Sequence, residues 1–249
     1  MHKDTIVFQL ATHYLPKVSL CIERLMQTIE EASLEKHPVI HHYALNNIFE
    51  IIKLIEKPEL KSRFLKEFMR IEHGVNKSLI SLSDKAFARL FVQIQVLSHM
   101  IGRFGENIHL DPFLQSLRLV QSSHSIDGEL YSPQLLLWLD NKPEARQADL
   151  ERWLKQLKTL NDTVKAYLSL FREMATFETI SLIHGFYQCP LPVRTTSCLL
   201  IMLRMEKNTD FVPKMQIGHH GFSLRLCEAS TMREVQNQTI VVDLSICQL

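Results

Sequence analysis

Apolar residues recur with the period of an α-helix through the first two-thirds of the chain. The first such stripe, from about Tyr14, has steps of four, three and four residues. The stripes that predict helices are Val18, Ile22, Leu25 and Ile29; Leu45, Ile48, Ile52 and Ile55; Leu60, Phe64, Phe68 and Ile71; Phe91, Ile94 and Leu97; and Leu150, Trp153, Leu157, Val164, Leu168 and Phe171. The last stripe is long enough to predict the longest helix of the chain.

Prolines and hydroxyl side chains predict where several of these helices begin. Pro38 and Pro143 suit the first turn of a helix, where a missing backbone N–H costs nothing. Ser132–Pro133 and Ser83–Asp84 each place a capping hydroxyl directly before a helical pattern. Gly74 is expected to end or weaken the third helix, because glycine has a low helix propensity.

An alternating pattern predicts strands at both ends of the chain. Thr5 to Leu10 alternates at the N-terminus, and after Thr176 the helical period gives way to alternation. The later sets are Leu199, Ile201, Leu203 and Met205; Phe222, Leu224 and Leu226; and Ile240, Val242, Leu244 and Ile246. Turn residues between these sets are typical of antiparallel hairpins, and we expect the N-terminal strand to join their sheet.

The pattern therefore predicts an α+β fold in which a mainly helical domain packs on a smaller antiparallel β-strand domain. The helical domain is expected at residues 11–178. The β-strand domain is expected to be discontinuous, with residues 1–10 plus 179–249.

Composition narrows the classes of protein. Among 249 residues, 28 are Lys or Arg and 27 are Asp or Glu, so the formal net charge of +1 gives no general reason to expect nucleic acid. The five cysteines form no CxxC pair, which disfavours a disulfide framework or a structural zinc site and fits a reducing cytosol. No stretch approaches the roughly 20 apolar residues that span a bilayer. We expect a cytoplasmic protein without direct membrane insertion.

Motifs for catalysis are missing from the sequence. The seven glycines form neither a P-loop nor a GxGxxG pattern, and no GxSxG elbow is present. His37 and His41 stand four residues apart, but zinc would need further ligands that the spacing does not supply, so we expect no metal. Two alternatives stay open: an enzyme of unknown reaction that uses a His or Glu in the inter-domain cleft, and a nucleic-acid binder that uses basic helices.

Basic side chains are the more informative candidates. Lys53, Lys57 and Lys61 recur every four residues and could present a positive stripe, although the acidic residues among them also fit an ordinary solvated face. Arg225 stands between two inward-pointing leucines, so it is predicted to project from the polar face of a sheet. A guanidinium there offers a planar fork for carboxylates.

The chain resembles the ZapD family over most of its length. The similar segments, in the family's order, are the N-terminal strand with Phe8, EKPELKSRFLKEF from Glu56 to Phe68, SPQLLLWLD from Ser132 to Asp140, RWLKQL from Arg152 to Leu157, ATFETISLIHGFYQ from Ala175 to Gln188, and QIGHHGFSLRL from Gln216 to Leu226. The GFYQ motif after the long helix is the most specific of them.

This resemblance implies a non-enzymatic role in bacterial cell division. ZapD-like proteins bind the C-terminal tail of the tubulin-like protein FtsZ. As homodimers they crosslink and bundle FtsZ filaments, which stabilises the Z-ring at the division septum. We therefore expect the FtsZ tail and a second copy of the chain as partners, at mid-cell, with no cofactor and no nucleic acid.

The resemblance also implies a positively charged tail pocket between the two domains. Arg225 matches a family arginine, and Lys57 stands where the family has a basic residue, often arginine. Lys61 and the turn residues His219 and His220 complete the expected set. A further family arginine is replaced by Gly221, so this chain is expected to bind more loosely or to prefer a differently charged tail.

Overall fold

The computed structural model describes residues 4–122, 132–191, 199–207, 209–218 and 221–249. It divides into a strand unit, Met1–Lys17 with Leu170–Leu249, and a helical unit, Val18–Ser169. The α+β fold is thereby confirmed, with the N-terminal strand in a sheet. The expected domain limits stay a prediction.

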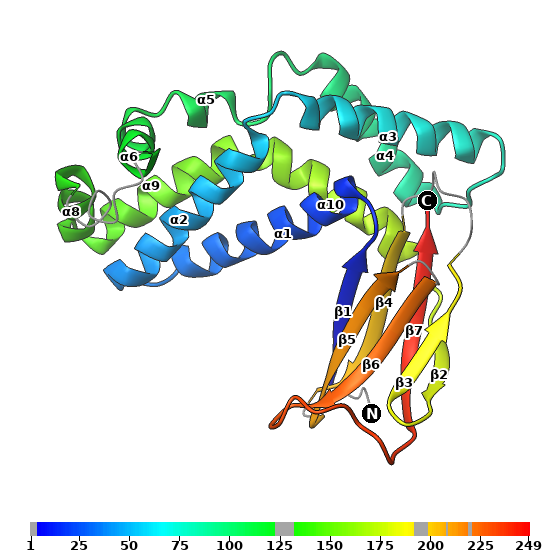
Figure 1. Cartoon of the computed structure of the whole chain (residues 1–249). Coiled ribbons are helices and arrows are strands. Elements are labelled where there is room, and N and C mark those ends of the chain that lie inside the picture. Colours follow the sequence, from blue (N-terminus) through cyan, green and yellow to red (C-terminus); the bar gives the residue numbers. More distant parts are fainter. Residues whose placement is uncertain (1–3, 123–131, 192–198, 208, 219–220) are drawn as a thin grey trace. The chain divides into compact units, whose positions relative to one another are not determined.

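The first sheet of the strand unit joins both ends of the chain (Figure 1). Its order is β1-β4-β7-β2, with β1 at Thr5–Ala11, β4 at Leu199–Glu206, β7 at Ile240–Gln248 and β2 at Glu178–Leu182. All its pairs are antiparallel, and Phe8 of β1 stands opposite Leu203 of β4. The N-terminal strand therefore joins this sheet, as the alternating pattern predicted.

A second, three-stranded sheet has the order β3-β6-β5, with β3 at Phe186–Cys189, β6 at Gly221–Glu228 and β5 at Phe211–Gly218. The chain leaves the first sheet and enters the second at His184 and Gly185, whose φ angles are 53° and 68°. Gly185 is required here, because a Cβ on it would lie 2.8 Å from Cβ of Val235.

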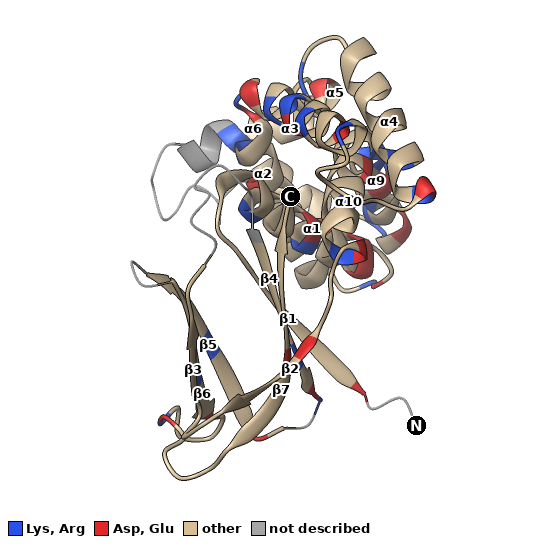
Figure 2. Ribbon diagram, turned by 90° about the vertical axis from the view of Figure 1, so that its right-hand side faces the viewer, with Lys and Arg blue, Asp and Glu red and all other residues tan. Residues whose placement is uncertain are grey.

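The core of the strand unit lies between these two sheets, which Figure 2 shows as separate layers. Alternate side chains from both sheets point inward, as expected for packed sheets. The buried members of this core are Leu182, Ile201, Leu203, Met205, Phe222, Leu224, Leu226, Val235, Val242 and Leu244.

The helices begin largely where the caps predicted. Their bounds are α1 Tyr14–Ser33, α2 Pro38–Ile55, α3 Glu59–Asn76, α4 Asp84–His99, α5 Glu106–His109, α6 Pro112–Ser122, α8 Pro133–Asp140, α9 Pro143–Gln156 and α10 Lys158–Glu173. The Ser83 hydroxyl accepts a hydrogen bond from the Ala86 N–H at 3.2 Å. The Ser132 hydroxyl accepts one from the Leu135 N–H at 3.4 Å, so both predicted N-caps are confirmed.

Gly74 lies in the last turn of α3, which ends at Asn76, close to where the sequence predicted the end of this helix. One detail of the helices differs from expectation. The predicted longest helix is divided at Leu157, whose N–H is shared between the Trp153 and Leu154 carbonyls. Leu157 is fully buried, and its side chain packs so closely on Gly105 that a Cβ there would lie 3.1 Å from it. Of the described helices, α1 is the longest, with 20 residues.

A buried arginine ties four segments of the helical unit together. Arg146 of α9 is 3% exposed. Its Nε donates to His41 Nδ1 at 2.9 Å, and its two Nη atoms donate to the carbonyls of Lys36, Leu139 and Asn141. Two of these carbonyls stand at the C-terminal end of α8, where backbone acceptors lack helical partners. Arg146 therefore caps the C-terminal end of α8 from within the helical unit.

Candidate functional site

Arg225 occupies the exposed face of the second sheet, as the alternation predicted. Its neighbours along β6, Leu224 and Leu226, are fully buried, whereas the Arg225 side chain is 48% exposed. Directly beside it on β3 stands Phe186, with the guanidinium carbon 4.6 Å from the ring centroid. Its Nη1 donates to Glu234 Oε2 at 2.7 Å. The aromatic ring and the carboxylate hold the guanidinium in one orientation.

A second cation lies in the same row. Lys214 on β5 stands directly opposite Arg225, and its side chain is exposed. Figure 2 shows basic positions on both strands. Like charges in directly opposed positions repel each other, so this row favours an anion beside it. The sequence reasoning missed Lys214, although counting outward from the paired Gly218 and Gly221 places it in register with Arg225.

Gly221 begins β6 in a backbone conformation that favours glycine. Its φ is 112°, a conformation that side chains other than glycine rarely adopt. A Cβ here would collide with the Cys189 carbonyl oxygen and lie 2.8 Å from Cα of Pro190. The backbone therefore leaves no room for a side chain at this position. His219 and His220, also predicted for the site, lie outside the described residues.

In the helical unit, Lys57 and Lys61 stand at the junction of α2 and α3. Lys57 is exposed. Lys61 is half-buried, and its Nζ donates to the Met100 carbonyl at the end of α4. Lys53 forms an ion pair with Glu50 at 2.6 Å, as expected for an ordinary solvated face. The regular spacing therefore does not produce a uniform stripe of available cations.

Further cations reach this junction from distant parts of the sequence. Arg118 of α6 pairs with Glu56 at 2.7 Å, and Arg103 donates to the Glu56 backbone carbonyl at 3.5 Å. Burial lowers the pKa of His109, and the charges of Arg103 and Arg118 lower it further, whereas Glu106 and Glu56 raise it. Cations and carboxylates are therefore mixed at this junction. Sequence spacing could not reveal this cluster, because its members come from separate segments.

The described residues contain neither a metal-binding cluster nor a membrane-spanning helix. Among the residues that the structure describes, no group of three or more His, Cys, Asp or Glu side chains is arranged to hold a metal ion. His41 serves instead as an acceptor for Arg146, and its Nε2 lies 2.8 Å from the Glu35 carbonyl. In the described ranges, no helix combines the length and apolar character that crossing a bilayer requires.

Comparison with known proteins identifies the family. The family model of ZapD, described as a cell division protein, matches residues 20–225. The chain belongs to the ZapD family. This confirms the resemblance drawn from the sequence and places the role of the chain in cell division.

Relatives in the ZapD family cover nearly the whole chain. The cell division protein ZapD of Coxiella burnetii (strain RSA 331 / Henzerling II) is 24% identical over 255 residues, which cover 98% of this chain and 97% of that protein. ZapD of Vibrio vulnificus (strain CMCP6) is 24% identical over 93% of this chain and 94% of its own. ZapD of Nitrosomonas eutropha (strain DSM 101675 / C91 / Nm57) is 23% identical over 98% and 100%.

Proposed function

We propose that this chain binds the C-terminal tail of FtsZ and, as a homodimer, crosslinks and bundles FtsZ filaments to stabilise the Z-ring. It acts without catalysis, in the cytoplasm at the division septum. The observation that carries this proposal is the row of Lys214, Arg225 and Phe186 on the exposed face of the second sheet. Membership of the ZapD family supports the cell-division context.

This row suits an extended acidic peptide. Arg225 presents a guanidinium that is already oriented by Phe186 and Glu234, so little side-chain entropy is lost when a carboxylate binds. Lys214 adds a second positive charge opposite it. Phe186 offers an apolar surface for a neighbouring side chain of the peptide. Charge and one apolar contact together can select an acidic segment.

Lys57 is the proposed contact in the helical unit. It is exposed, and it follows Glu56, whose carboxylate and backbone carbonyl are already engaged by Arg118 and Arg103. Lys61 contributes charge rather than a flexible contact, because its ammonium already binds the Met100 carbonyl. Use of Lys57 and Arg225 by one peptide stays a prediction, and separate variants of each residue test it.

Dimerisation turns weak contacts into a bridge. Ordering a flexible tail costs conformational entropy, so a single tail is bound weakly. In a two-fold dimer, a filament that is held by one tail presents further tails at high effective concentration. Because the contacts lie at the surface, bundling should decrease as ionic strength rises.

Pelleting with FtsZ polymers tests the proposal. The chain should sediment with full-length FtsZ and not with FtsZ that lacks its tail. Arg225→Glu should weaken binding about tenfold, because reversal of one partly exposed charge is worth on the order of 1.4 kcal/mol. Lys155→Glu, at an exposed position of α9, is the matched control for net charge and should bind normally.

A second variant tests the same contact with the opposite expected effect, because an unfolded chain could not bind FtsZ more tightly. Glu234→Gln removes the internal partner of Arg225 while keeping the side-chain shape, so binding should become tighter. Equal binding by Arg225→Glu, Glu234→Gln and the parent chain would refute the site. A strictly monomeric chain that ignores FtsZ in analytical ultracentrifugation and pelleting would refute the function.

A further inference from the structure

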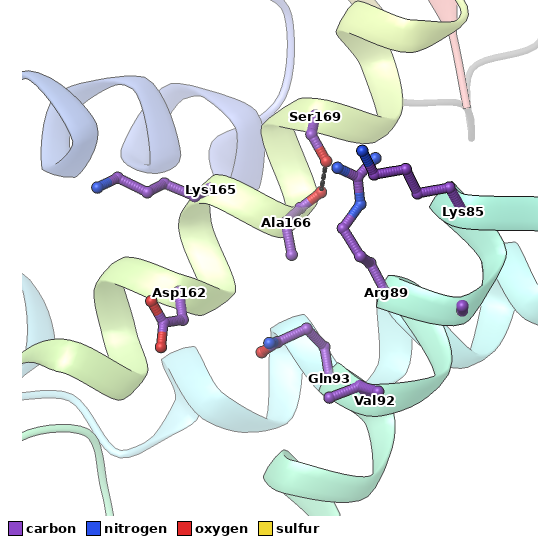
Figure 3. Close-up of a pocket in the computed structure, with 9 residues that line it drawn as sticks. Lys85, Arg89, Val92, Gln93, Asp162, Lys165, Ala166 and Ser169 are labelled. Carbon is purple, nitrogen blue, oxygen red and sulfur yellow. Dashed lines mark hydrogen bonds between the residues drawn. The ribbon is translucent and has the colours of Figure 1, made fainter. Parts of the chain in front are cut away.

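Polar side chains that line a pocket between α4 and α10 have partners within the helical unit (Figure 3). The Thr163 hydroxyl lies 3.1 Å from Gln93 Oε1, and Asp162 forms an ion pair with Lys158 at 2.5 Å. These side chains do not require a ligand. Backbone groups along an open sheet edge are a different case, because only another extended strand can pair a whole row of them.

β1 is the least protected edge strand of the two described sheets, whose edges are β1, β2, β3 and β5. Proline, charged side chains and short length are the usual protection against pairing with another chain. β5 contains Pro213 and Lys214, β2 contains Glu178, and β3 has only four residues. β1, at Thr5–Ala11, has seven residues and neither a charge nor a proline. Its open edge is therefore suited to a further strand.

Hydrogen bonding to β4 determines which backbone groups of β1 face the open edge. Directly before β1, the Asp4 carbonyl accepts a hydrogen bond from the Lys207 N–H at 2.7 Å. In an antiparallel pair, residues that exchange hydrogen bonds with the neighbouring strand alternate with residues that do not. Every second residue after Asp4 therefore bonds to β4. The residues between them direct their N–H and C=O groups toward the open edge, and they are Thr5, Val7 and Gln9.

Apolar side chains are exposed at the same edge. Ile6 is 40% exposed and Val7 is 41% exposed. Ile6 points to the same face of the sheet as Phe8, which packs on the core between the two sheets. A strand added beside β1 would therefore cover Ile6 on one face and Val7 on the other. The charges nearest this edge compensate each other, because Lys207 lies 3.1 Å from Asp4.

We infer that two copies of this chain join along β1, with the two strands antiparallel about a two-fold axis at Val7. In this register Val7 pairs with the partner's Val7 and Thr5 pairs with the partner's Gln9, and each pair exchanges backbone hydrogen bonds in both directions. Ile6 lies opposite the partner's Phe8 in a non-hydrogen-bonded pair, where side chains approach more closely. The two four-stranded sheets then form one continuous sheet.

A second copy fits this edge better than a charged peptide does. The segment is self-complementary, since the same residues supply donors and acceptors on both sides of the axis. It has no charge that an acidic or basic strand could recognise, and two neutral copies do not repel each other. The pairing rests on the proposed function for its biological role, because it supplies the homodimer that bridges two filaments.

Sedimentation velocity of the full chain tests the pairing through charge at Val7. Val7→Lys and Val7→Glu each place two like charges at the two-fold axis, so the dissociation constant of the dimer should rise roughly tenfold or more. An equimolar mixture of the two variants should recover the dimer, because opposite charges then face each other. Val241→Lys is the matched control. Val241 is 60% exposed on β7, an inner strand of the same sheet, so this variant should dimerise as the parent does.

Amide hydrogen exchange of the parent chain provides a second measurement that needs no variant. The Val7 N–H should be protected at concentrations where the dimer forms and should exchange rapidly after dilution. The Ile6 N–H, which bonds to β4, should be protected at both concentrations and serves as the internal control. The pairing is overturned if the Val7 variants remain dimeric, or if the Val7 N–H is unprotected at every concentration.

Assays with FtsZ distinguish failure of this pairing from failure of the proposed function. Val7→Lys should still sediment with FtsZ polymers, because the row around Arg225 is unchanged, but it should no longer bundle them in light scattering. If Val7→Lys stays dimeric and bundles filaments, the β1 pairing is refuted and the function stands. If the parent pairs through β1 but ignores FtsZ, the function is refuted and the pairing stands.

Discussion

Replacing Arg146 by methionine should be strongly destabilising. Arg146 is 3% exposed, and its guanidinium donates to His41 and to the carbonyls of Lys36, Leu139 and Asn141. Methionine has a similar length and packs well in a core, so the change removes the hydrogen bonds while filling much of the volume. The α1–α2 connection and the end of α8 then lose a common donor.

The size of the effect follows from the acceptors that are left behind. A hydrogen bond to a charged group contributes about 1.5–3 kcal/mol, and a buried acceptor without a partner costs about 1–3 kcal/mol. The carbonyls lie close together and share one guanidinium, so these values do not add fully. Removal of one partner from a buried charged network typically costs 3–5 kcal/mol. We therefore expect Arg146→Met to lower the free energy of unfolding by about 4 kcal/mol.

Urea unfolding followed by far-UV circular dichroism measures this change. Arg63→Met on α3 is the matched control, because its 3.2 Å ion pair with Glu59 is solvent-exposed and worth at most about 0.5 kcal/mol. A loss below about 1.5 kcal/mol for Arg146→Met would refute the view that this residue holds the helical unit together.

Two further predictions concern pH and Gly221. Burial, together with the Arg146 charge, keeps the pKa of folded His41 below its usual value, so the unfolded chain binds more protons at this residue. The contribution of neutral His41 to stability should be fully present above about pH 6.5 and decrease as the pH falls below it. His41→Asn should reduce this dependence in urea titrations at several pH values. Gly221→Arg introduces the side chain that the family resemblance implies. It should lower the thermal midpoint sharply and fail to improve FtsZ pelleting, since its Cβ has no room beside Cys189 and Pro190. A stable variant with tighter binding would contradict this prediction.

Helix starts and strand faces were predictable because their signals are local. Ser83 and Ser132 cap helices through bonds that span three residues, and the alternation in β6 fixes which side chains point inward. The division at Leu157 was not predictable, because neither proline nor glycine marks it. The Leu157 side chain packs against Gly105, a residue that is distant in sequence, and such a contact leaves no local signal. The separation of the strands into two sheets was missed for a related reason: alternation gives the face of a strand, not the sheet it joins.

The same limit applies to the candidate site. Alternation correctly placed Arg225 on the exposed face. Its partner Glu234 comes from the segment after β6, and Lys214 comes from the neighbouring strand, so both depend on pairing rather than on spacing. Helical spacing, in turn, suggested Lys61 as a member of a positive stripe, whereas in the structure its ammonium binds the Met100 carbonyl.

The ion pair between Arg225 and Glu234 has a consequence for how tightly one tail can be held. An incoming carboxylate must exchange with Glu234, so one charged hydrogen bond replaces another and the net gain is small. Lys214 and Phe186 supply contacts that this exchange does not cancel. Selectivity should therefore depend on a second acidic residue of the peptide, bound by Lys214, and on an apolar residue that packs on Phe186. Under the proposed function, a weak single contact is useful, because filaments held by many exchangeable tails can slide and rearrange while the bundle persists.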